Sequence, residues 1–270
     1  MGRVASVIVL LISLPMLGGC ATSGSRSAER YGKTFYLDGA GNWGFGAVEV
    51  PGGLREAGYK GNVEIYIWTT SLIPLIDQLN IPAAKLRAAA LANRIKDYRH
   101  RFPENKLNII ALSAGTGVAT WAVESLDEDT KINNLVLLAS SLSHDYDMSK
   151  ALKYMTGKVY VYHSPHDEVL AAIPLIGTID GKRGVHSVGQ VGLTTPAGFA
   201  GRIVNTPWSR KHVRFGWTGS HTDCTRKPFI RHVISKHVID RNPRFRRHRA
   251  DGGHQSAAEV RTTHLAAAAR

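Results

Sequence analysis

The stretch NIIALSAGTGVATW, residues 108–121, decides the fold of this chain. An apolar run typical of a buried strand stops at Ser113, small residues surround this serine, and apolar residues then return at helical spacing. A strand that passes directly into a helix is the repeating unit of parallel sheets. The stretch therefore predicts an α/β fold with Ser113 at the end of one strand, either as an ordinary turn residue or as a nucleophile.

The chain between residues 33 and 240 repeats this alternation of short apolar runs and helical patterns. The expected strands are 33–37, 63–68, 107–112, 135–139, 158–163 and 212–217, and the expected helices are 83–102, 115–126 and 222–239. Strands of such continuous apolarity are typical of parallel sheets that are buried on both faces. We therefore expect a three-layer α/β/α sandwich with a mostly parallel sheet of about six strands.

The residues around the serine resemble a known catalytic turn. The sequence ALSAG, residues 111–115, is similar to the nucleophile elbow Gly-x-Ser-x-Gly of the α/β-hydrolase superfamily, with Ala111 in the first position. In that turn the strand and the helix nearly collide, so the residues two places before and after the serine are small. The resemblance implies a strained backbone at Ser113 that lifts its hydroxyl above the sheet.

A serine nucleophile needs a base that takes its proton and a carboxylate that orients the base. In the superfamily the acid and then the histidine follow later strands. Asp167 follows the expected strand 158–163, and His221 follows the expected strand 212–217. The resemblance therefore implies a catalytic triad of Ser113, Asp167 and His221.

Other acidic residues compete with Asp167. Asp145 and Asp147 follow the preceding strand and are alternative acids, and Asp167 itself is suited to capping a helix. His163, His166 and Asp167 also have a spacing that could hold a metal ion, but three ligands on one loop are a weak signal. We expect neither a metal nor another cofactor.

Two other histidines compete with His221. His212 begins the strand expected at 212–217 and so lies at the wrong end of it, and His186 lies in a glycine-rich segment with no strand before it. His221 stands in a loop after the last expected strand, where the superfamily places its base.

Acyl transfer builds negative charge on the carbonyl oxygen, so two hydrogen-bond donors are expected beside the serine. The backbone N–H of Ala114 is one. The stretch LDGAGNWG after the first expected strand resembles the oxyanion loop of the superfamily, with Asp38 in place of the usual histidine. The resemblance implies the N–H of Ala40 or Gly41 as the second donor, and a glycine-rich turn needed only for geometry is the alternative.

The N-terminal segment has the features of an export signal. A positive start precedes an apolar run at 4–17, which is shorter than the ~20 residues of a membrane-spanning helix. The following LGGC resembles the lipobox of bacterial lipoproteins, which implies a signal peptide at 1–19, a lipid anchor such as palmitate on Cys20, and the cell envelope, by resemblance the outer membrane. An ordinary signal peptide cleaved beside a cysteine is the alternative. The Ser- and Gly-rich residues 20–32 are expected to form a flexible tether.

The C-terminal segment 241–270 carries clustered arginines and few large apolar residues, so we expect a basic, disordered tail. Much of the net charge of +13 lies there, and no nucleic-acid partner is expected because no aromatic and basic platform is visible. With Cys20 assigned to the anchor, Cys224 remains the single other cysteine, which excludes a disulfide framework. A lone cysteine is most often a small buried apolar residue.

The resemblance covers residues 33–240 and implies a serine hydrolase of carboxylesterase or lipase type, acting on a small-molecule or lipid ester. The alternative is a non-catalytic lipoprotein that keeps the scaffold and binds an envelope partner. Walls of an acyl pocket, or simply core, are expected from Ser71, Leu72, Ile73, Pro74, Leu170, Ile173, Leu175 and Ile176. The long segment 177–210 is expected to lie over the site as a loop or small cap.

Overall fold

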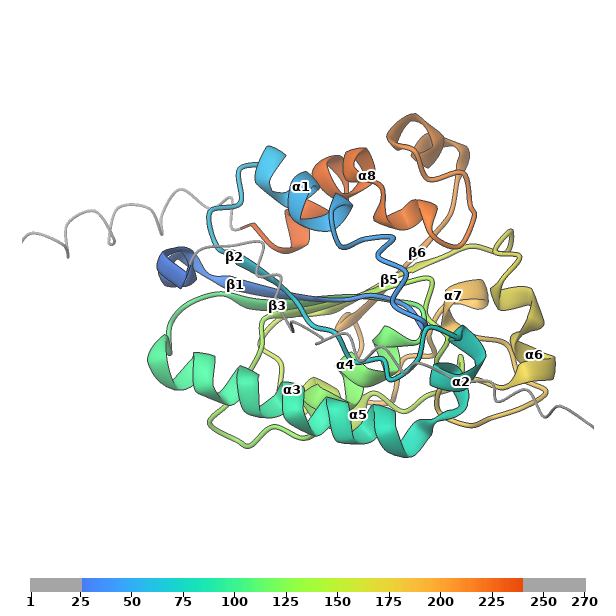
Figure 1. The fold of residues 1–270 in the computed structure, drawn as a ribbon, viewed down its shortest axis with the longest axis horizontal. Coiled ribbons are helices and arrows are strands. Elements are labelled where there is room, and N and C mark those ends of the chain that lie inside the picture. Colours follow the sequence, from blue (N-terminus) through green and yellow to red (C-terminus); the bar gives the residue numbers. More distant parts are fainter. Residues whose placement is uncertain (1–25, 240–270) are drawn as a thin grey trace, which may run out of the picture.

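The computed structural model describes residues 26–239, in which six parallel strands form one sheet in the order β2-β1-β3-β4-β5-β6 (Figure 1). The strands are β1 (Lys33–Leu37), β2 (Asn62–Ile65), β3 (Leu107–Leu112), β4 (Asn134–Leu138), β5 (Val159–His163) and β6 (Ile203–Pro207). The expected fold class is confirmed. The expected signal peptide at 1–19, the anchor at Cys20 and the basic tail at 241–270 lie outside the described residues.

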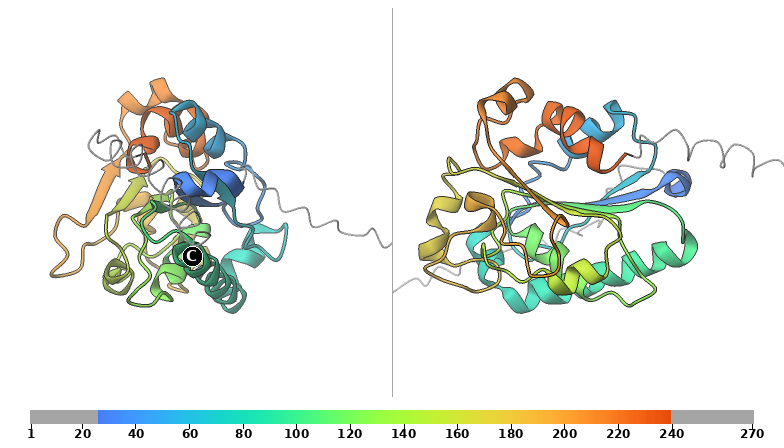
Figure 2. Two further views of the ribbon diagram at one scale, coloured as in Figure 1. Left: turned by 90° about the vertical axis from the view of Figure 1, so that its left-hand side faces the viewer. Right: turned by 180° about the vertical axis from the view of Figure 1, so that it is seen from behind.

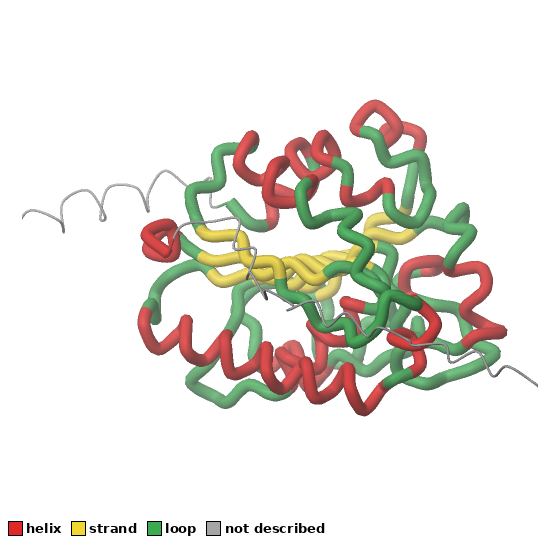
Figure 3. Tube along the Cα trace, viewed as in Figure 1, coloured by secondary structure: helices red, strands yellow, loops and turns green. Residues whose placement is uncertain are grey.

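Helices cover both faces of this sheet, as the strands between two helical layers in Figure 3 show and as the turned views in Figure 2 confirm. One face carries α3 (Ile81–Arg101), α4 (Gly115–Glu124) and α5 (Ser149–Lys153), and the other carries α1 (Glu49–Glu56) and α8 (Lys227–His232). The short helices α2 (Pro74–Leu79), α6 (Ile173–Ile176) and α7 (Val188–Val191) lie toward the carboxyl ends of the strands. Among the helices of residues 26–239, none is both long and apolar enough to cross a membrane.

The central strands explain why the sheet is buried on both faces. Every residue of β3 is buried, and successive side chains point to opposite faces. Ile109 packs into the core cluster under α3 and α4, whereas Ile110 packs into the cluster under α1 and α8. The near-continuous apolar run that predicted a parallel strand therefore serves two cores at once.

One expected strand is wrong. Residues 212–217 do not pair with the sheet, because Arg210–Phe215 form a short 3-10 helix, η3, at whose start the Ser209 N–H donates to His212 Nδ1 at 3.1 Å. The sixth strand is β6, which lies inside the segment 177–210 that we expected to be a loop or cap. This strand pairs only with β5, and only its first residue, Ile203, is buried, so it lacks the apolar run by which the other strands were found.

The expected helix 222–239 is also wrong in its length. It is divided into η4 (Asp223–Thr225), α8 and η5 (Ile234–His237). Pro228 stands in the first turn of α8, where its missing N–H has no intrahelical acceptor to lose. Inside a continuous helix the same proline would remove a hydrogen bond, which explains the break before α8.

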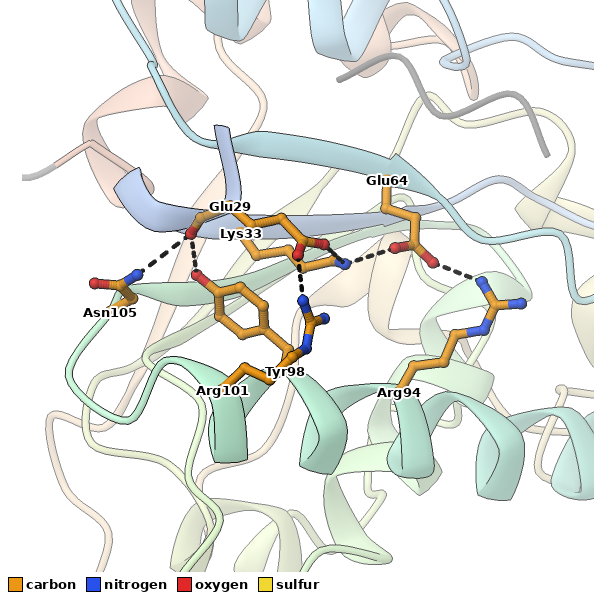
Figure 4. Close-up of polar contacts among 7 residues, drawn as sticks. All are labelled: Glu29, Lys33, Glu64, Arg94, Tyr98, Arg101 and Asn105. Atoms are coloured by element: carbon orange, nitrogen blue, oxygen red, sulfur yellow. Dashed lines mark hydrogen bonds and ion pairs between the residues drawn. The ribbon is translucent and has the colours of Figure 1, made fainter. Parts of the chain in front are cut away.

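The expected flexible tether at 20–32 is wrong for its last part. Residues Arg26–Tyr31 form a 3-10 helix, η1, whose Glu29 is buried. The Glu29 carboxylate pairs with Lys33 Nζ and with Arg101 Nη1, both at 2.7 Å, and the same Lys33 pairs with Glu64 at 2.7 Å (Figure 4). These ion pairs tie η1 to β1, β2 and α3 at the amino ends of the strands.

Candidate active site

Ser113 directly follows β3 and has a backbone conformation that is rare outside glycine. Its φ of 52° lies in the left-handed region, which costs an L-residue roughly 1 kcal/mol or more. The turn is held by its backbone, because Ser113 N–H donates to the carbonyl of Leu138 at 3.0 Å and Thr116 N–H donates to the carbonyl of Ser113 at 3.1 Å. Such strain at the end of a central strand is characteristic of a serine displayed for chemistry.

The small residues around Ser113 have a steric cause. A Cβ added to Gly115 would lie 2.4 Å from the carbonyl oxygen of Asp38, a contact that real Cβ atoms do not make. A Cβ added to Gly39 would lie 3.2 Å from the Cβ of Ser113. The turn after β3 and the loop after β1 are therefore packed directly against each other, and Gly115 is needed for this approach.

Asp167 and His221 are in direct contact although 54 positions separate them. His221 Nδ1–H donates to Asp167 Oδ2 at 2.8 Å, and the Asp167 carboxylate is almost wholly buried. The other carboxylate oxygen accepts the N–H of Leu170 at 2.9 Å, so Asp167 also caps the turn that follows it. With Nδ1 protonated and bound to the carboxylate, Nε2 is the ring nitrogen that can accept a proton.

The loop that carries His221 is fixed to the loop that carries Asp167. Ser220 Oγ–H donates to Glu168 Oε1 at 2.6 Å, so the residues beside the histidine and beside the acid are also joined. From the other side, Cys224 Sγ–H donates to the carbonyl of His221 at 3.3 Å. Burial raises the pKa of the Cys224 thiol well above its usual range, so this cysteine acts as a buried structural residue rather than as a nucleophile.

The alternative acids have other partners. Asp145 forms an exposed ion pair with Lys182 at 2.8 Å. Asp147 accepts the N–H of Ser149 at 2.9 Å and so caps α5. Among the described residues neither of them contacts His221, whereas Asp167 does.

The alternative histidines also serve other purposes. His212 is buried, accepts the N–H of Ser209 at 3.1 Å and stacks on Trp217 with ring centroids 5.1 Å apart. His186 lies 3.2 Å from Gln190 Oε1 on the surface. In residues 26–239 no group of three or more histidine, cysteine or acidic side chains is arranged to hold a metal ion.

Ser113 and the Asp167–His221 pair follow strands β3, β5 and β6, whose carboxyl ends share one edge of the sheet. Within the described range no hydrogen bond joins the Ser113 hydroxyl to His221. Catalytic hydrogen bonds are often formed only when a substrate is bound. The assignment of these three residues as a triad stays a prediction.

The expected oxyanion donors differ in their present partners. Gly41 N–H donates to Asp77 Oδ2 at 3.0 Å, so it is already engaged. The N–H groups of Ala40 and Ala114 have no hydrogen-bond acceptor within residues 26–239. Between the two alternatives in the loop after β1, the structure therefore favours Ala40 over Gly41.

Asp77 was not found from the sequence. It lies on α2 in the stretch PLIDQL, where its only signal is a single acid among apolar residues. Its partner Gly41 lies 36 positions away in the chain, and no local pattern reveals this contact.

The residues expected to wall an acyl pocket differ in exposure, and Ser71, Pro74 and Ile176 are half-buried. Leu72, Ile73 and Leu175 are exposed, the last by 85%. Leu170 and Ile173 are buried in the core cluster under α1 and α8 and are not available to a ligand.

Comparisons with known proteins find similar structures but no family. No protein-family model and no curated protein matches the chain. Dienelactone hydrolase from Anabaena variabilis ATCC 29413 is 17% identical, with 77% of this chain and 87% of that chain covered and a TM-score of 0.42. Est1E from Butyrivibrio proteoclasticus is 10% identical, with 80% and 91% covered and a TM-score of 0.42. Esterase PE8 is 12% identical, with 71% and 85% covered and a TM-score of 0.39.

At identities and TM-scores this low, the similarity does not assign the chain to a family or an activity. Unrelated chemistries occur on the same layered α/β architecture. The function depends instead on the side chains at the carboxyl edge of the sheet.

Proposed function

We propose that this protein is a serine hydrolase that cleaves an ester or similar acyl bond, with Ser113 as nucleophile, His221 as base and Asp167 as the acid that orients it. The observation that carries the proposal is the pairing of two features. Ser113 has a strained left-handed backbone at the end of a central strand, and the buried Asp167 carboxylate and its partner His221 lie after strands that end at the same edge.

The reaction follows from these groups. His221 Nε2 takes the proton of Ser113 as Oγ attacks the acyl carbonyl, and the Asp167 carboxylate stabilises the charged imidazole. The N–H groups of Ala114 and Ala40 would donate to the oxygen that becomes negative. Collapse of the tetrahedral intermediate expels the alcohol, which receives the proton from His221 and leaves an acyl-Ser113 ester. Water, deprotonated by His221, then releases the carboxylic acid.

The place of action is a separate part of the proposal and is supported by the sequence alone. We propose that Cys20 carries a lipid anchor that holds the protein at the bacterial cell envelope, where a small-molecule or lipid ester is its substrate. Cys20→Ser is expected to move the protein from the membrane fraction to the soluble fraction. Retention of this variant in the membrane fraction would contradict the anchor.

The chemistry is tested with a fluorophosphonate probe, which labels activated serines. The parent protein is expected to be labelled and to hydrolyse short-chain nitrophenyl esters, while Ser113→Ala does neither. Ser125→Ala is the matched control, since Ser125 stands at the far end of α4 and its hydroxyl donates to the carbonyl of Trp121. A folded parent that is neither labelled nor active would instead support a non-catalytic protein that binds an envelope partner.

A further inference from the structure

We propose that Asp77 is a positioning residue of the same site, which fixes the loop after β1 so that the Ala40 N–H is held ready for the developing oxyanion. This inference rests on the proposed function. Asp77 is 1% exposed and lies on α2, outside the three expected catalytic residues and outside the loop that it would position.

The Asp77 carboxylate joins three separate segments. Oδ2 accepts the N–H of Gly41 at 3.0 Å, in the loop after β1. Oδ1 accepts the N–H of Thr70 at 2.9 Å, its hydroxyl at 3.1 Å and the N–H of Ser71 at 3.2 Å, in the loop after β2. Bonds to a charged acceptor are roughly twice as strong as neutral ones. One buried carboxylate therefore locks the two loops and α2 together.

The contacts of the loop after β1 alternate along its backbone. Gly39 N–H donates to Asp38 Oδ1 at 3.0 Å and Gly41 N–H donates to Asp77, while the Ala40 N–H between them has no acceptor in the described part of the chain. Gly39 also packs against Ser113, as the 3.2 Å approach of its added Cβ shows. Two carboxylates thus hold the peptides on either side of one unused donor, close to the serine.

A second tie joins the same two loops. Trp43 Nε1–H donates to the carbonyl of Leu72 at 3.0 Å, although the Trp43 ring itself is largely exposed. Removal of this bond should loosen the loop after β1 without opening the core.

The test uses Asp77→Asn, which keeps the shape of the side chain. Its amide oxygen can still accept the three donors of Thr70 and Ser71, but its NH₂ then faces the Gly41 N–H, donor against donor. We expect kcat for a nitrophenyl ester to fall about 10- to 100-fold with KM changed by less than about threefold, because donors act on the transition state only when held in place. Inhibition by a phenylboronic acid, which forms a tetrahedral adduct with an active serine, should weaken in parallel.

Asp180→Asn is the matched control. Asp180 also ties down a loop, since it accepts the N–H and the hydroxyl of Ser143 at 2.8 and 2.6 Å, but within residues 26–239 no hydrogen bond joins it to the loop after β1. If both variants lower the melting temperature alike and only Asp77→Asn lowers kcat, a general loss of stability is excluded. Trp43→Phe should lower kcat about threefold, and it decides the matter if Asp77→Asn does not fold.

The outcomes separate this inference from the function on which it rests. A parent that is inactive and unlabelled overturns both. An active parent whose kcat and boronic acid inhibition are unchanged in Asp77→Asn, or in Trp43→Phe where that variant decides, overturns the role of Asp77 alone.

Discussion

A buried carboxylate lies at each end of strand β1, and the two differ in the charge of their hydrogen-bond partners. Glu29, just before the strand, pairs with Lys33 and Arg101, and Figure 4 shows both cations directed at it. Asp38, just after the strand, is also buried but accepts uncharged donors, among them the Tyr36 hydroxyl and the Gly39 N–H, each at 3.0 Å.

The pKa values follow this difference. Burial alone would raise the pKa of Glu29, but its bonds to Lys33 and Arg101 outweigh burial and lower it. Burial raises the pKa of Asp38, and its hydrogen bonds do not fully offset that effect. At the amino end of the sheet the buried carboxylate is therefore paired with cations. At the carboxyl end burial destabilises the charged form of Asp38, Ser113 is strained, and N–H donors are unused.

The largest effect on activity is expected from a substitution at the carboxyl end of the sheet. Asp167→Asn is expected to lower kcat/KM about 10⁴-fold, because the amide no longer favours the required tautomer of His221 or its charged form. The Leu170 N–H can still be capped, so the change in melting temperature should be small. Asp145→Asn, at the exposed alternative acid, is the control and should stay within about threefold of the parent. Equal activity of Asp167→Asn and the parent would contradict the triad.

The amino end should respond in stability and not in catalysis. Lys33→Met removes the cation shared by Glu29 and Glu64, and it is expected to cost about 3 kcal/mol in the free energy of unfolding with unchanged kcat. Urea denaturation measures the loss. Lys96→Met removes only an exposed pair with Asp127 and should cost about 0.5 kcal/mol or less. A cost for Lys33→Met as small as for the control would show that the buried network is not needed.

Strain at the carboxyl end can be measured by comparing two inactive variants. Ser113→Gly is expected to be more stable than Ser113→Ala by about 1 kcal/mol, because only glycine adopts a φ of 52° without a steric cost. Both variants lack the hydroxyl, so the difference reports the backbone alone. If Ser113→Ala is the more stable of the two in thermal or urea unfolding, the turn is not strained.

The smallest expected effect is a difference in pH dependence. The lowered pKa of Glu29 stabilises the fold above its unfolded value of 4.5, and this stabilisation is lost as the pH falls. The raised pKa of Asp38 does the opposite, since stability is lost as the pH rises above the unfolded value of 3.8 and through the folded one.

Melting temperatures between pH 4 and 7 therefore distinguish the two carboxylates. Relative to the parent, Glu29→Gln should be increasingly destabilised as the pH rises, while Asp38→Asn should gain relative stability over the same change. Curves that move in the same direction for both variants would contradict the contrast between the two ends of β1.

Most of the sheet could be predicted because a strand that is buried on both faces appears in the sequence as a local apolar run. The apolar runs before Ser113 and before Asp167 coincide with β3 and β5, and the polar residues after them lie where parallel strands end. β6 has no such apolar run, because most side chains of this edge strand are half-buried or exposed. The segment 212–217 resembles a strand because of its apolar residues, but residues 212–215 belong to the 3-10 helix η3, in which Val213 is exposed.

The contacts that could not be predicted are those made between distant segments by single polar residues. Glu29 stands in a Ser- and Gly-rich stretch that is typical of a linker, and distant partners such as Arg101, 72 positions away, show that it is part of the fold. The sequence around Asp77 indicates only a helix residue, and its contact with the Gly41 N–H is evident only in the structure. The hydrogen bond between Asp167 and His221 was expected from the order of motifs, while the availability of Ala40 rather than Gly41 depends on backbone geometry alone.

The edge strand β6 has a consequence for association between molecules. It is five residues long and ends in Pro207, which has no N–H to offer to another strand. The Asn205 side chain binds both the N–H and the carbonyl of Leu193 at 2.9 Å, which keeps a loop of the same chain beside this strand. Few groups are left here on which a neighbouring molecule could extend the sheet, and aggregation through this side is disfavoured.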